Sequence, residues 1–517
     1  MIPILTPAEA KAWDEAAEAA GRPLRMLMEV AGRTVANEIC VQFDEVISDG
    51  VLVITGGGGN GGDGWVAARA LHVRGVKVVV VEAATPAGGP AADARRVALE
   101  DGVRMIEAGE RWPSVGVVVD AMLGTGARGA PQGDIATMIQ WLRSLDIPRV
   151  AVDGPSGLDL ETGIDHGALP ASLTITFGGF RRGHLLARDL VGEVLVFDVG
   201  HPRPDPRLPV WVDPAWARSI VRPFAAGIHK GDRGRLAVVG GTPGMTGAAR
   251  LAARSAFAAG AGVVHVVVPD QAVSDIALAE PDVLVSGHPF AAPLQDSLVE
   301  LLYRVDTVAI GPGLGRDPGR GEFVLAVLEH SRRALIDADA LTVLAPHREQ
   351  LAKLAADREL LLTPHVGEFR TLFPECADGV ATNPWDRAAT AAELSGATVL
   401  LKGVPTVVAQ TGVPSLSVTS GNPGLATGGS GDVLSGLAAA FLAQGIGAQE
   451  AGAVAAYLMG RAADRAALHH GTRGLRPMQV VSEIPTTWRE LDGTVEDHEL
   501  AFSLSLALGG FNRPTPE

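Results

Sequence analysis

Short runs of Val, Ile and Leu, each followed by a glycine-rich or acidic turn and often by a helix-sized segment, recur along this 517-residue chain. The runs lack the polar alternation of a strand with one wet face, so they predict strands buried on both faces of a sheet. Strands separated by helices are joined by crossovers, which favours mostly parallel sheets covered by helices on both sides. The pattern therefore predicts an α/β fold with three layers.

The apolar runs form two groups, and the length of the chain suits two domains. The first group predicts strands at 51–55, 76–83, 115–122, 150–154, 173–177 and 193–200, with helices at 63–75 and 134–145. The second group predicts strands at 235–240, 263–269, 307–313, 334–341 and 398–403, with Ala-rich helices at 431–443 and 448–468. A segment rich in Pro and charge, 201–209, marks a domain edge. We predict domains at 1–222 and 223–490 and a polar tail at 491–517, and we expect the polar chain after Pro485 to be partly unordered.

The charge balance limits the kinds of partner. Lys and Arg number 43 against 59 Asp and Glu, which gives a net charge of −16 without a basic stripe for nucleic acid. The two cysteines, Cys40 and Cys376, lie too far apart in the sequence to suggest a disulfide framework, and they fit a reducing compartment. The chain begins without the charged and apolar regions of a signal peptide, and no apolar run approaches a membrane span. We expect a cytoplasmic protein without a membrane or nucleic-acid partner.

A glycine-rich turn follows the first strand of the first group, in the sequence VLVITGGGGNGGDGW at 51–65. Because glycines lack side chains, backbone amides there can approach a phosphate with a helix N-terminus behind them. The turn has neither the full dinucleotide motif of a dehydrogenase nor the Lys of a Walker loop, which argues against hydride transfer and NTP hydrolysis. Asn60 and Asp63 add side-chain oxygens within this turn.

Acidic turns follow two more of the predicted strands. Asp120 ends the run at 115–122, and Asp153 and Ser156 follow the next strand. An Asp after a strand more often caps a helix, and that interpretation is the commoner one for either residue alone. Three glycine-rich polar turns at the carboxyl ends of parallel strands instead favour one ligand site at the edge of the sheet.

These motifs carry a family resemblance. LMEVAGRTVA at 27–36, GGGGNGGDG, VDAMLGTG and VDGPSGLD, in this order over about residues 1–220, resemble the YjeF N-terminal family of NAD(P)H-hydrate epimerases. The resemblance implies proton transfer by Asp153 and a potassium ion held by Asn60, Asp120 and Ser156. It implies that hydrated NADH or NADPH is bound by Gly59, Asn60, Gly61, Gly62, Asp63, Gly124, Thr125, Gly126, Ala127, Arg128, Gly129, Ala130 and Asp153. The chain departs from the family pattern at Val30, where the family has Asn, and at Gly57 and Gly59, where it has Pro and Asn.

The second half contains its own glycine-rich helix start, NPGLATGGSGDVLSG at 422–436. Gly428, Gly429 and Gly431 precede Asp432, so a carboxylate lies beside the free amides of a helix N-terminus. Such a carboxylate can accept a proton next to a bound phosphate. A simple capping role does not explain the small residues that come before it.

HKG, GTPGMTGAA, GPGLG, LTPHVGE, LLKG and GGSGD follow in order over roughly 225–490 and resemble the dehydratase branch of the ribokinase-like family. The resemblance implies that Mg²⁺ and ADP bind here, that Asp432 is the base, and that the hydrated cofactor is bound by Ala248, Gly313, His365 and Asp432. It implies that the nucleotide is held by Lys402, Gly403, Val404, Pro405, Thr406 and Gly431. On its own, His365 is equally well explained as a residue that completes a helix start.

Together the two resemblances predict a bifunctional enzyme that epimerises hydrated NAD(P)H and dehydrates one epimer at the expense of ADP. Ribokinase-like relatives often assemble, so we expect a homo-oligomer. The alternatives are a vitamin or sugar kinase with a regulatory nucleotide-binding domain, and a first half that only binds its ligand. A phosphorylated vitamin or sugar would reveal the first alternative, and epimer exchange unaffected by a change at Asp153 would reveal the second.

Overall fold

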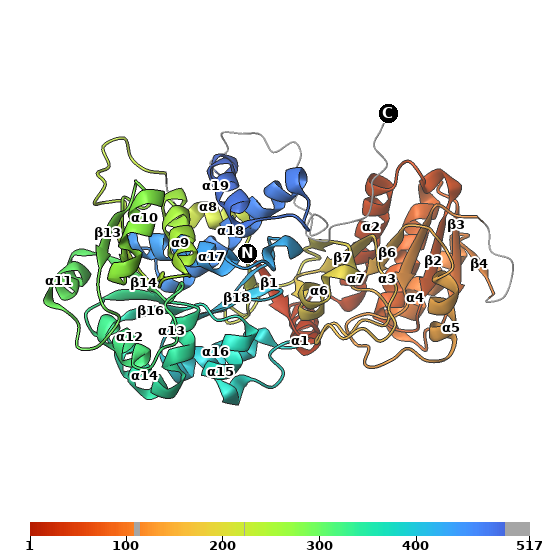
Figure 1. Ribbon diagram of the computed structural model, residues 1–517. Coiled ribbons are helices and arrows are strands. Elements are labelled where there is room, and N and C mark those ends of the chain that lie inside the picture. The colour runs from red at the N-terminus through yellow and green to blue at the C-terminus, as the bar shows by residue number, and fades with distance from the viewer. Residues whose placement is uncertain (108–113, 222, 492–517) are drawn as a thin grey trace. The chain divides into compact units, whose positions relative to one another are not determined.

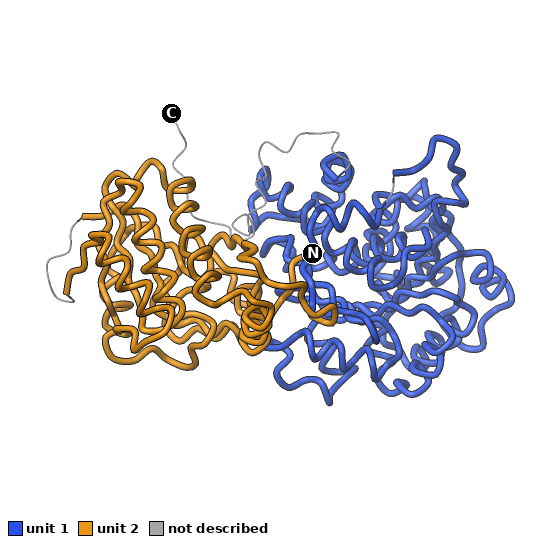
Figure 2. Tube along the Cα trace, turned by 180° about the vertical axis from the view of Figure 1, so that it is seen from behind, with its two compact units in different colours: residues 1, 209–501, 509–517 blue, residues 2–208, 502–508 orange. Residues whose placement is uncertain are grey.

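The computed structural model describes residues 1–107, 114–221 and 223–491, and its chain divides into two compact units (Figures 1 and 2). The N-terminal unit comprises residues 2–208, and the C-terminal unit begins at Pro209. β10 (Val210–Trp211) belongs to the C-terminal unit because it pairs with β19 (Leu416–Val418). The functional domains predicted at 1–222 and 223–490 stay a prediction, and the predicted polar tail lies outside the described residues except for Leu491.

The N-terminal unit is built from short parallel strands and crossover helices. Its strands are β1 (Ile2–Leu5), β2 (Val51–Thr55), β3 (Val78–Glu82), β4 (Arg104–Ile106), β5 (Val117–Ala121), β6 (Arg149–Val152), β7 (Leu173–Phe177), β8 (Phe180–Arg181) and β9 (Glu193–Phe197). Its helices are α1 (Pro7–Ala19), α2 (Leu24–Gln42), α3 (Gly59–Val73), α4 (Gly89–Glu100), α5 (Gly133–Leu142), α6 (Arg182–Leu186) and α7 (Arg188–Val191).

The main sheet of this unit has the order β4-β3-β2-β5-β6-β7-β9, and all its pairs are parallel. The strand order reverses between β2 and β5, so a crevice opens there at the carboxyl ends of the strands. Alternate residues of β2 enter two separate cores: Val51 and Val53 pack with residues of α2 and α3, and Leu52 and Ile54 pack with residues of α5. The sheet is therefore buried on both faces, as the apolar runs predicted.

The C-terminal unit repeats this architecture with a larger sheet. Its strands are β10, β11 (Arg235–Val239), β12 (Val263–Val268), β13 (Leu284–Gly287), β14 (Thr307–Ile310), β15 (Arg333–Ile336), β16 (Glu359–Leu362), β17 (Thr398–Leu401), β18 (Thr406–Ala409) and β19. Its helices are α8 (Pro214–Ile220), α9 (Thr246–Ala258), α10 (Val273–Ala279), α11 (Asp296–Arg304), α12 (Arg320–Glu329), α13 (Asp339–Leu344), α14 (Arg348–Ala355), α15 (Val366–Leu372), α16 (Pro384–Ser395), α17 (Ser430–Ala443), α18 (Ala448–His470) and α19 (Pro477–Leu491).

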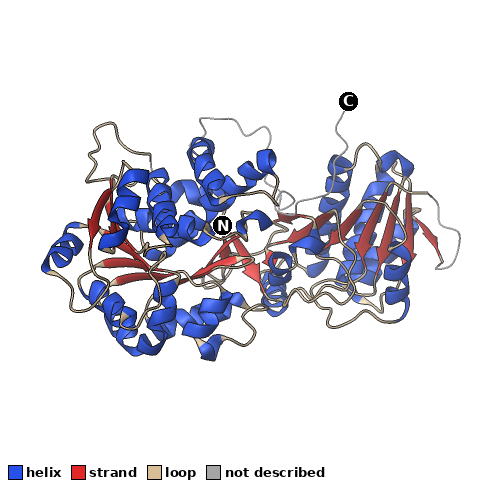
Figure 3. Ribbon diagram, in the orientation of Figure 1, coloured by secondary structure: helices blue, strands red, loops and turns tan. Residues whose placement is uncertain are grey.

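Strands β11 to β17 of this unit are parallel in the order β13-β12-β11-β14-β15-β16-β17, and β17, β18 and β19 pair antiparallel. Helices α9, α17 and α18 cover one face and α12, α14 and α16 the other (Figures 1 and 3). Small residues let α17 and α9 touch: a Cβ on Gly436 would lie 2.0 Å from the Ala252 carbonyl oxygen. This close packing fixes α17, whose first turn carries Asp432.

The predicted α/β fold class is confirmed, and the differences lie at element boundaries. The glycine turn after β2 is shorter than expected because α3 already begins at Gly59, which places Asn60 and Asp63 on the helix. The predicted strand at 334–341 is wrong beyond Ile336, since α13 begins at Asp339. Helix α19 runs through Pro485 to Leu491, so the described part of the segment after this proline is helical.

Candidate active sites

A cavity of about 850 Å³ opens at the carboxyl ends of β2, β5 and β6 in the N-terminal unit. The sequence-predicted residues on its wall are Gly59, Asn60, Asp63, Gly124, Thr125, Gly126, Ala127, Arg128 and Asp153. Gly61 and Gly62 are buried at the start of α3, and neither they nor Gly129 and Ala130 line the cavity. The switch point of the sheet thus brings together three turns that lie far apart in the sequence.

The start of α3 lies directly on the turn that precedes it. A Cβ on Gly61 would lie 1.8 Å from the Gly56 carbonyl oxygen, whereas a Cβ on Gly59 would have no neighbour within 4 Å. We expect Gly61→Ala to destabilise the N-terminal unit by about 1–3 kcal/mol because the backbone must move apart. The midpoint of thermal unfolding measures this loss, and Gly59→Ala is the matched control in the same helical turn. An equally stable Gly61→Ala protein would contradict this packing.

Asp153 is held by several donors at the carboxyl end of β6. Its Oδ2 accepts hydrogen bonds from the Thr125 amide at 2.7 Å and from the Thr125 hydroxyl, and its Oδ1 accepts one from the Thr176 hydroxyl at 3.1 Å. The Arg181 guanidinium lies 3.2 Å from Oδ1. Burial alone would raise the pKa of Asp153, but Arg181 and the Thr125 hydrogen bonds outweigh it and hold the pKa below its usual value. Asp153 is therefore an ionised carboxylate in the cavity.

The backbone of Asp153 adopts a left-handed conformation with φ of +64°, which few residues other than Gly occupy. His184 stabilises it: the Arg181 amide donates to Nδ1 at 3.1 Å, so Nε2 carries the proton and donates to the Asp153 carbonyl oxygen at 2.6 Å. Burial lowers the pKa of His184 to about 4, which keeps the ring neutral for both bonds. Strained backbone of this kind occurs most often at functional sites.

A second carboxyl group faces the same cavity. Asp63, in the first turns of α3, has a pKa raised well above its usual value by burial and, to a smaller extent, by the charges of Asp153 and Asp14. The cavity thus contains one carboxyl group that favours its ionised form and one that favours its protonated form. Such a difference between neighbouring carboxyl groups is what a base and an acid require.

The predicted potassium ligands are linked through Leu123, whose backbone contacts both Asn60 on the cavity wall and Ser156, which contacts Asp120. The Ser156 hydroxyl donates to Asp120 Oδ1 at 2.6 Å and the Ser156 amide to Oδ2 at 2.8 Å, and burial raises the pKa of Asp120 against these bonds. The Asn60 amide nitrogen donates to the Leu123 carbonyl oxygen at 2.9 Å. The other side-chain atom of Asn60, Oδ1, is buried and has no hydrogen-bond partner among the described residues. A buried acceptor of this kind is costly unless a cation or a donor binds it.

The C-terminal unit has a charged cluster at the carboxyl ends of β15, β16 and β17. The Lys402 ammonium lies 2.8 Å from Asp337 Oδ1 and 3.8 Å from Glu368 Oε2. The Ser435 hydroxyl of α17 donates to Asp337 Oδ2 at 2.6 Å, which ties the strand end to the helix. Burial would lower the pKa of Lys402, but Asp337 and Glu368 raise it, so Lys402 is positively charged.

Asp432 lies beside this cluster in the first turn of α17. Its pKa is raised to about 7, first by burial and then by the charge of Asp337, while the charge of Lys402 lowers it. Gly431 next to it leaves room, since a Cβ there would lie 3.5 Å from the Lys402 ammonium. An acid with a pKa near neutrality accepts and releases protons readily at physiological pH.

The other predicted residues of this unit follow strands of the same sheet or, for Ala248, lie in the first turn of α9. A Cβ on Gly313 would lie 3.3 Å from the Ala248 Cβ, so these two residues are neighbours. Gly403, Val404 and Pro405 form the turn between β17 and β18, and Thr406 begins β18. His365 caps α15: its Nδ1 accepts a hydrogen bond from the Gly367 amide at 2.9 Å, and its own backbone amide donates to the Glu368 carboxylate at 2.9 Å. The structure gives His365 this capping role, and its part in ligand binding stays a prediction.

Sequence reasoning missed several residues that complete the two clusters. Arg181, His184 and Thr176 hold Asp153, and Ser435 holds Asp337. The sequence FGGFRRGHLL at 177–186 offered one signal, because charged residues followed a glycine turn directly after a predicted strand. The sequence identified Asp337 only as an acid after a predicted strand, and it did not indicate that Lys402 pairs with it.

Among the described residues, no three or more His, Cys, Asp and Glu side chains are grouped so that they could hold a metal ion. Across the same residues, none of the helices combines the length and the apolar character needed to cross a bilayer.

A buried carboxylate at the switch point of one sheet, and a carboxylate at a glycine-rich helix start beside a lysine in the other, define a two-part α/β enzyme. A family model described as YjeF-related protein N-terminus matches residues 24–183, and one described as NAD(P)H-hydrate dehydratase matches residues 236–486. The chain belongs to the family of bifunctional NAD(P)H-hydrate repair enzymes, which confirms the family that the motifs predicted.

Two curated relatives carry the name "Bifunctional NAD(P)H-hydrate repair enzyme Nnr". The relative from Moorella thermoacetica is 35% identical over 503 residues, covering 92% of this chain and 94% of its own. The relative from Escherichia coli is 35% identical over 489 residues, covering 91% and 90%. A solved ADP/ATP-dependent NAD(P)H-hydrate dehydratase from Bacillus subtilis, co-crystallised with ATP and Mg²⁺, is 23% identical with a TM-score of 0.48, covering 54% of this chain and 97% of its own.

Proposed function

We propose that the two clusters are two separate catalytic sites: the N-terminal cavity epimerises hydrated NADH and NADPH, and the C-terminal cluster dehydrates one epimer at the expense of ADP. The observation that carries the proposal is Asp432, a carboxyl group with a pKa of about 7 beside Lys402 at a helix N-terminus. Family membership supports the proposal, because the relatives are named bifunctional NAD(P)H-hydrate repair enzymes and the family model that matches residues 236–486 is described as NAD(P)H-hydrate dehydratase.

In the N-terminal cavity, Asp153 is the base that moves a proton to and from the hydrated ring. Thr125 and Arg181 keep it ionised and aimed at the cavity, and Asp63 supplies the protonated partner. Proton exchange between two such carboxyl groups lets the ring return to either epimer at its hydroxyl-bearing carbon. The remaining predicted cavity residues bind the nucleotide, with glycine amides against its phosphates.

The unpaired Asn60 oxygen supports the potassium site, since Asn60, Asp120 and Ser156 present only oxygen ligands, which hard cations prefer. A bound cation would supply positive charge that stabilises negative charge developing on the substrate. Asn60 Oδ1, the Asp120 carboxylate and the Ser156 hydroxyl would hold it.

In the C-terminal cluster, Asp432 removes the proton of the substrate hydroxyl, whose oxygen bonds to the β-phosphorus of ADP while AMP leaves. The carbon–oxygen bond then breaks with release of phosphate, and the neighbouring ring carbon loses a proton to restore the double bond. Lys402 and the amides around Gly431 stabilise the phosphates. Mg²⁺ bound with the nucleotide would neutralise charge on its phosphates.

The direct test is incubation of the full chain with both epimers of hydrated NADH, ADP, Mg²⁺ and potassium, followed by the absorbance of reduced nicotinamide. Two working sites convert the whole mixture. Conversion that stops at the fraction of one epimer would contradict the epimerase assignment, and no conversion would contradict the dehydratase. We also propose that the enzyme works as a homo-oligomer in the cytoplasm; light scattering checks the first and cell fractionation the second.

The pKa of Asp432 predicts how dehydration depends on pH. Because the base must be ionised, we expect kcat to be low at acidic pH, to rise as the pH passes about 7 and to level off above it. The measurement is kcat of dehydration from pH 5.5 to 9 with saturating ADP, using the one hydrated epimer that the site accepts as its substrate. Asp153 has a lowered pKa, so epimerisation is expected to lack this rise. A flat dehydration profile through pH 7 would argue against Asp432 as the base.

A further inference from the structure

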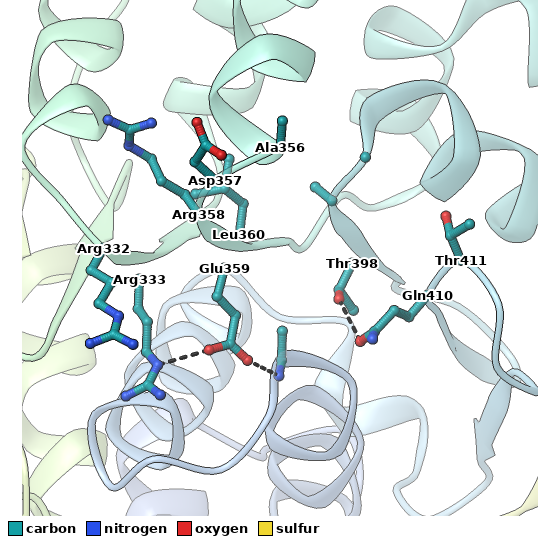
Figure 4. A pocket seen from close by; sticks show the side chains of 13 residues that line it. Arg332, Arg333, Ala356, Asp357, Arg358, Glu359, Leu360, Thr398, Gln410 and Thr411 are labelled. Carbon is teal, nitrogen blue, oxygen red and sulfur yellow. Dashed lines mark hydrogen bonds and ion pairs between the residues drawn. The ribbon is translucent and has the colours of Figure 1, made fainter.

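A second cavity of about 530 Å³ lies in the C-terminal unit, at the amino ends of β15, β16 and β17 (Figure 4). These three strands carry Asp337, His365 and Lys402 at their opposite, carboxyl ends. The cavity is therefore separate from the proposed dehydratase site, although the same strands connect the two. Its wall is formed by Arg332, Arg333, Ala356, Asp357, Arg358, Glu359, Leu360, Gly396, Ala397, Thr398, Gln410, Thr411 and Ala448.

The wall of this cavity is basic in a chain that is acidic overall. It carries three arginines against Asp357 and Glu359, while the whole chain has a net charge of −16. A volume of this size falls within the range of about 300–1,000 Å³ that is usual for small-molecule sites. A local excess of arginine in an acidic protein attracts anions.

Two arginines have donors to spare. Arg333 uses its Nε to bond Glu359 Oε2 at 2.8 Å, and its terminal nitrogens make no hydrogen bond or ion pair to the described residues. Glu359 Oε1 accepts the Ala448 amide of α18 at 2.8 Å, so this carboxylate fixes Arg333 while being occupied on both oxygens. The exposed Arg332 guanidinium makes no bond within the described part of the chain. These free donors line one cavity (Figure 4).

The rest of the wall is held in place without a ligand. Arg358 donates to the carbonyl oxygens of Leu328 and Glu329, both at 2.9 Å, which fixes the turn before β16. The Thr398 hydroxyl donates to Gln410 Oε1 at 3.1 Å, so the Gln410 amide nitrogen remains free to donate. A preformed wall binds a ligand with less loss of conformational freedom.

We propose that this cavity binds a phosphorylated small molecule of about nucleoside monophosphate size, with its phosphate on Arg332 and Arg333. The planar guanidinium matches phosphate oxygens in pairs, which a carboxylate-lined or apolar pocket cannot do. The Gln410 amide and Thr411 offer donors for the remainder of the ligand.

The test uses calorimetry on the full chain with AMP as the probe and adenosine as the phosphate-free comparison. To reduce binding at the proposed dehydratase site, Lys402→Met is the background in which Arg332→Glu is introduced. We expect AMP binding to persist in Lys402→Met, to weaken at least about tenfold when Arg332→Glu is added, and to be absent for adenosine. Arg304→Glu is the matched control, because Arg304 is an exposed arginine of the same unit on α11 and does not line the cavity.

Unchanged AMP affinity in the Arg332→Glu protein would overturn the proposal, as would equal binding of adenosine. Since Arg332 is exposed and unbonded, its substitution should leave the unfolding midpoint as it was, which separates lost binding from lost folding. Arg332→Glu alone should also keep its dehydratase activity without added AMP. Failure of this cavity proposal therefore does not contradict the dehydratase assignment, and failure of the dehydratase assignment does not contradict this proposal.

Discussion

Asp432→Asn is expected to lower kcat for ADP-dependent dehydration by about 10²–10⁴-fold and to leave epimerisation unchanged. The amide cannot accept the hydroxyl proton, yet it has nearly the same size and stays in the first turn of α17. Dehydration is measured as the initial rise in the absorbance of reduced nicotinamide, with the one hydrated epimer that the site accepts as substrate. Epimerisation is measured as the exchange between epimers, followed by chromatography. Each site provides an internal reference for the other.

A matched control comes from the next helix. Glu450 is also an acid in the first turn of a helix of the same unit, α18, but it lies outside the Lys402 cluster. Glu450→Gln should therefore dehydrate at the normal rate. Normal dehydration by Asp432→Asn would remove this residue from the mechanism and, with it, the main support for the assignment.

Asp153→Asn is expected to slow epimer exchange by a similar factor, about 10²–10⁴, while dehydration of the preferred epimer continues. Asn tolerates the left-handed backbone that Asp153 adopts, so the turn and its bond to His184 should survive. With a mixture of epimers and excess ADP, the absorbance should then stop at the fraction of the preferred epimer.

Asp134 supplies the control for this experiment. It is an exposed acid in the first turn of α5, in the same unit, and it does not line the cavity. Asp134→Asn should convert the epimer mixture completely. If Asp153→Asn does the same, the N-terminal cavity binds its ligand without performing the chemistry.

The residues that meet at the strand ends could be predicted, because a parallel sheet brings the carboxyl ends of its strands to one edge. Asp120 ends one buried apolar run and Ser156 follows the next, so the contact between Asp120 and Ser156 followed from the pattern. The short strands β16, β18 and β19 were missed, because runs of three or four apolar residues do not distinguish a strand from a buried helix.

The partners of these carboxylates were not predictable in the same way. Lys402 and Asp337 lie 65 residues apart, and Arg181 reaches Asp153 from a different strand. Such pairs depend on side-chain direction and burial, which a single sequence does not encode locally. The pKa of Asp432 is likewise a property of its burial beside Asp337 and Lys402, so the chemistry becomes visible only once the fold has assembled the cluster.

Each carboxylate cluster is built entirely from the residues of its own unit. Because one polypeptide carries both clusters, the two proposed sites are always made in equal numbers, whatever the level of expression.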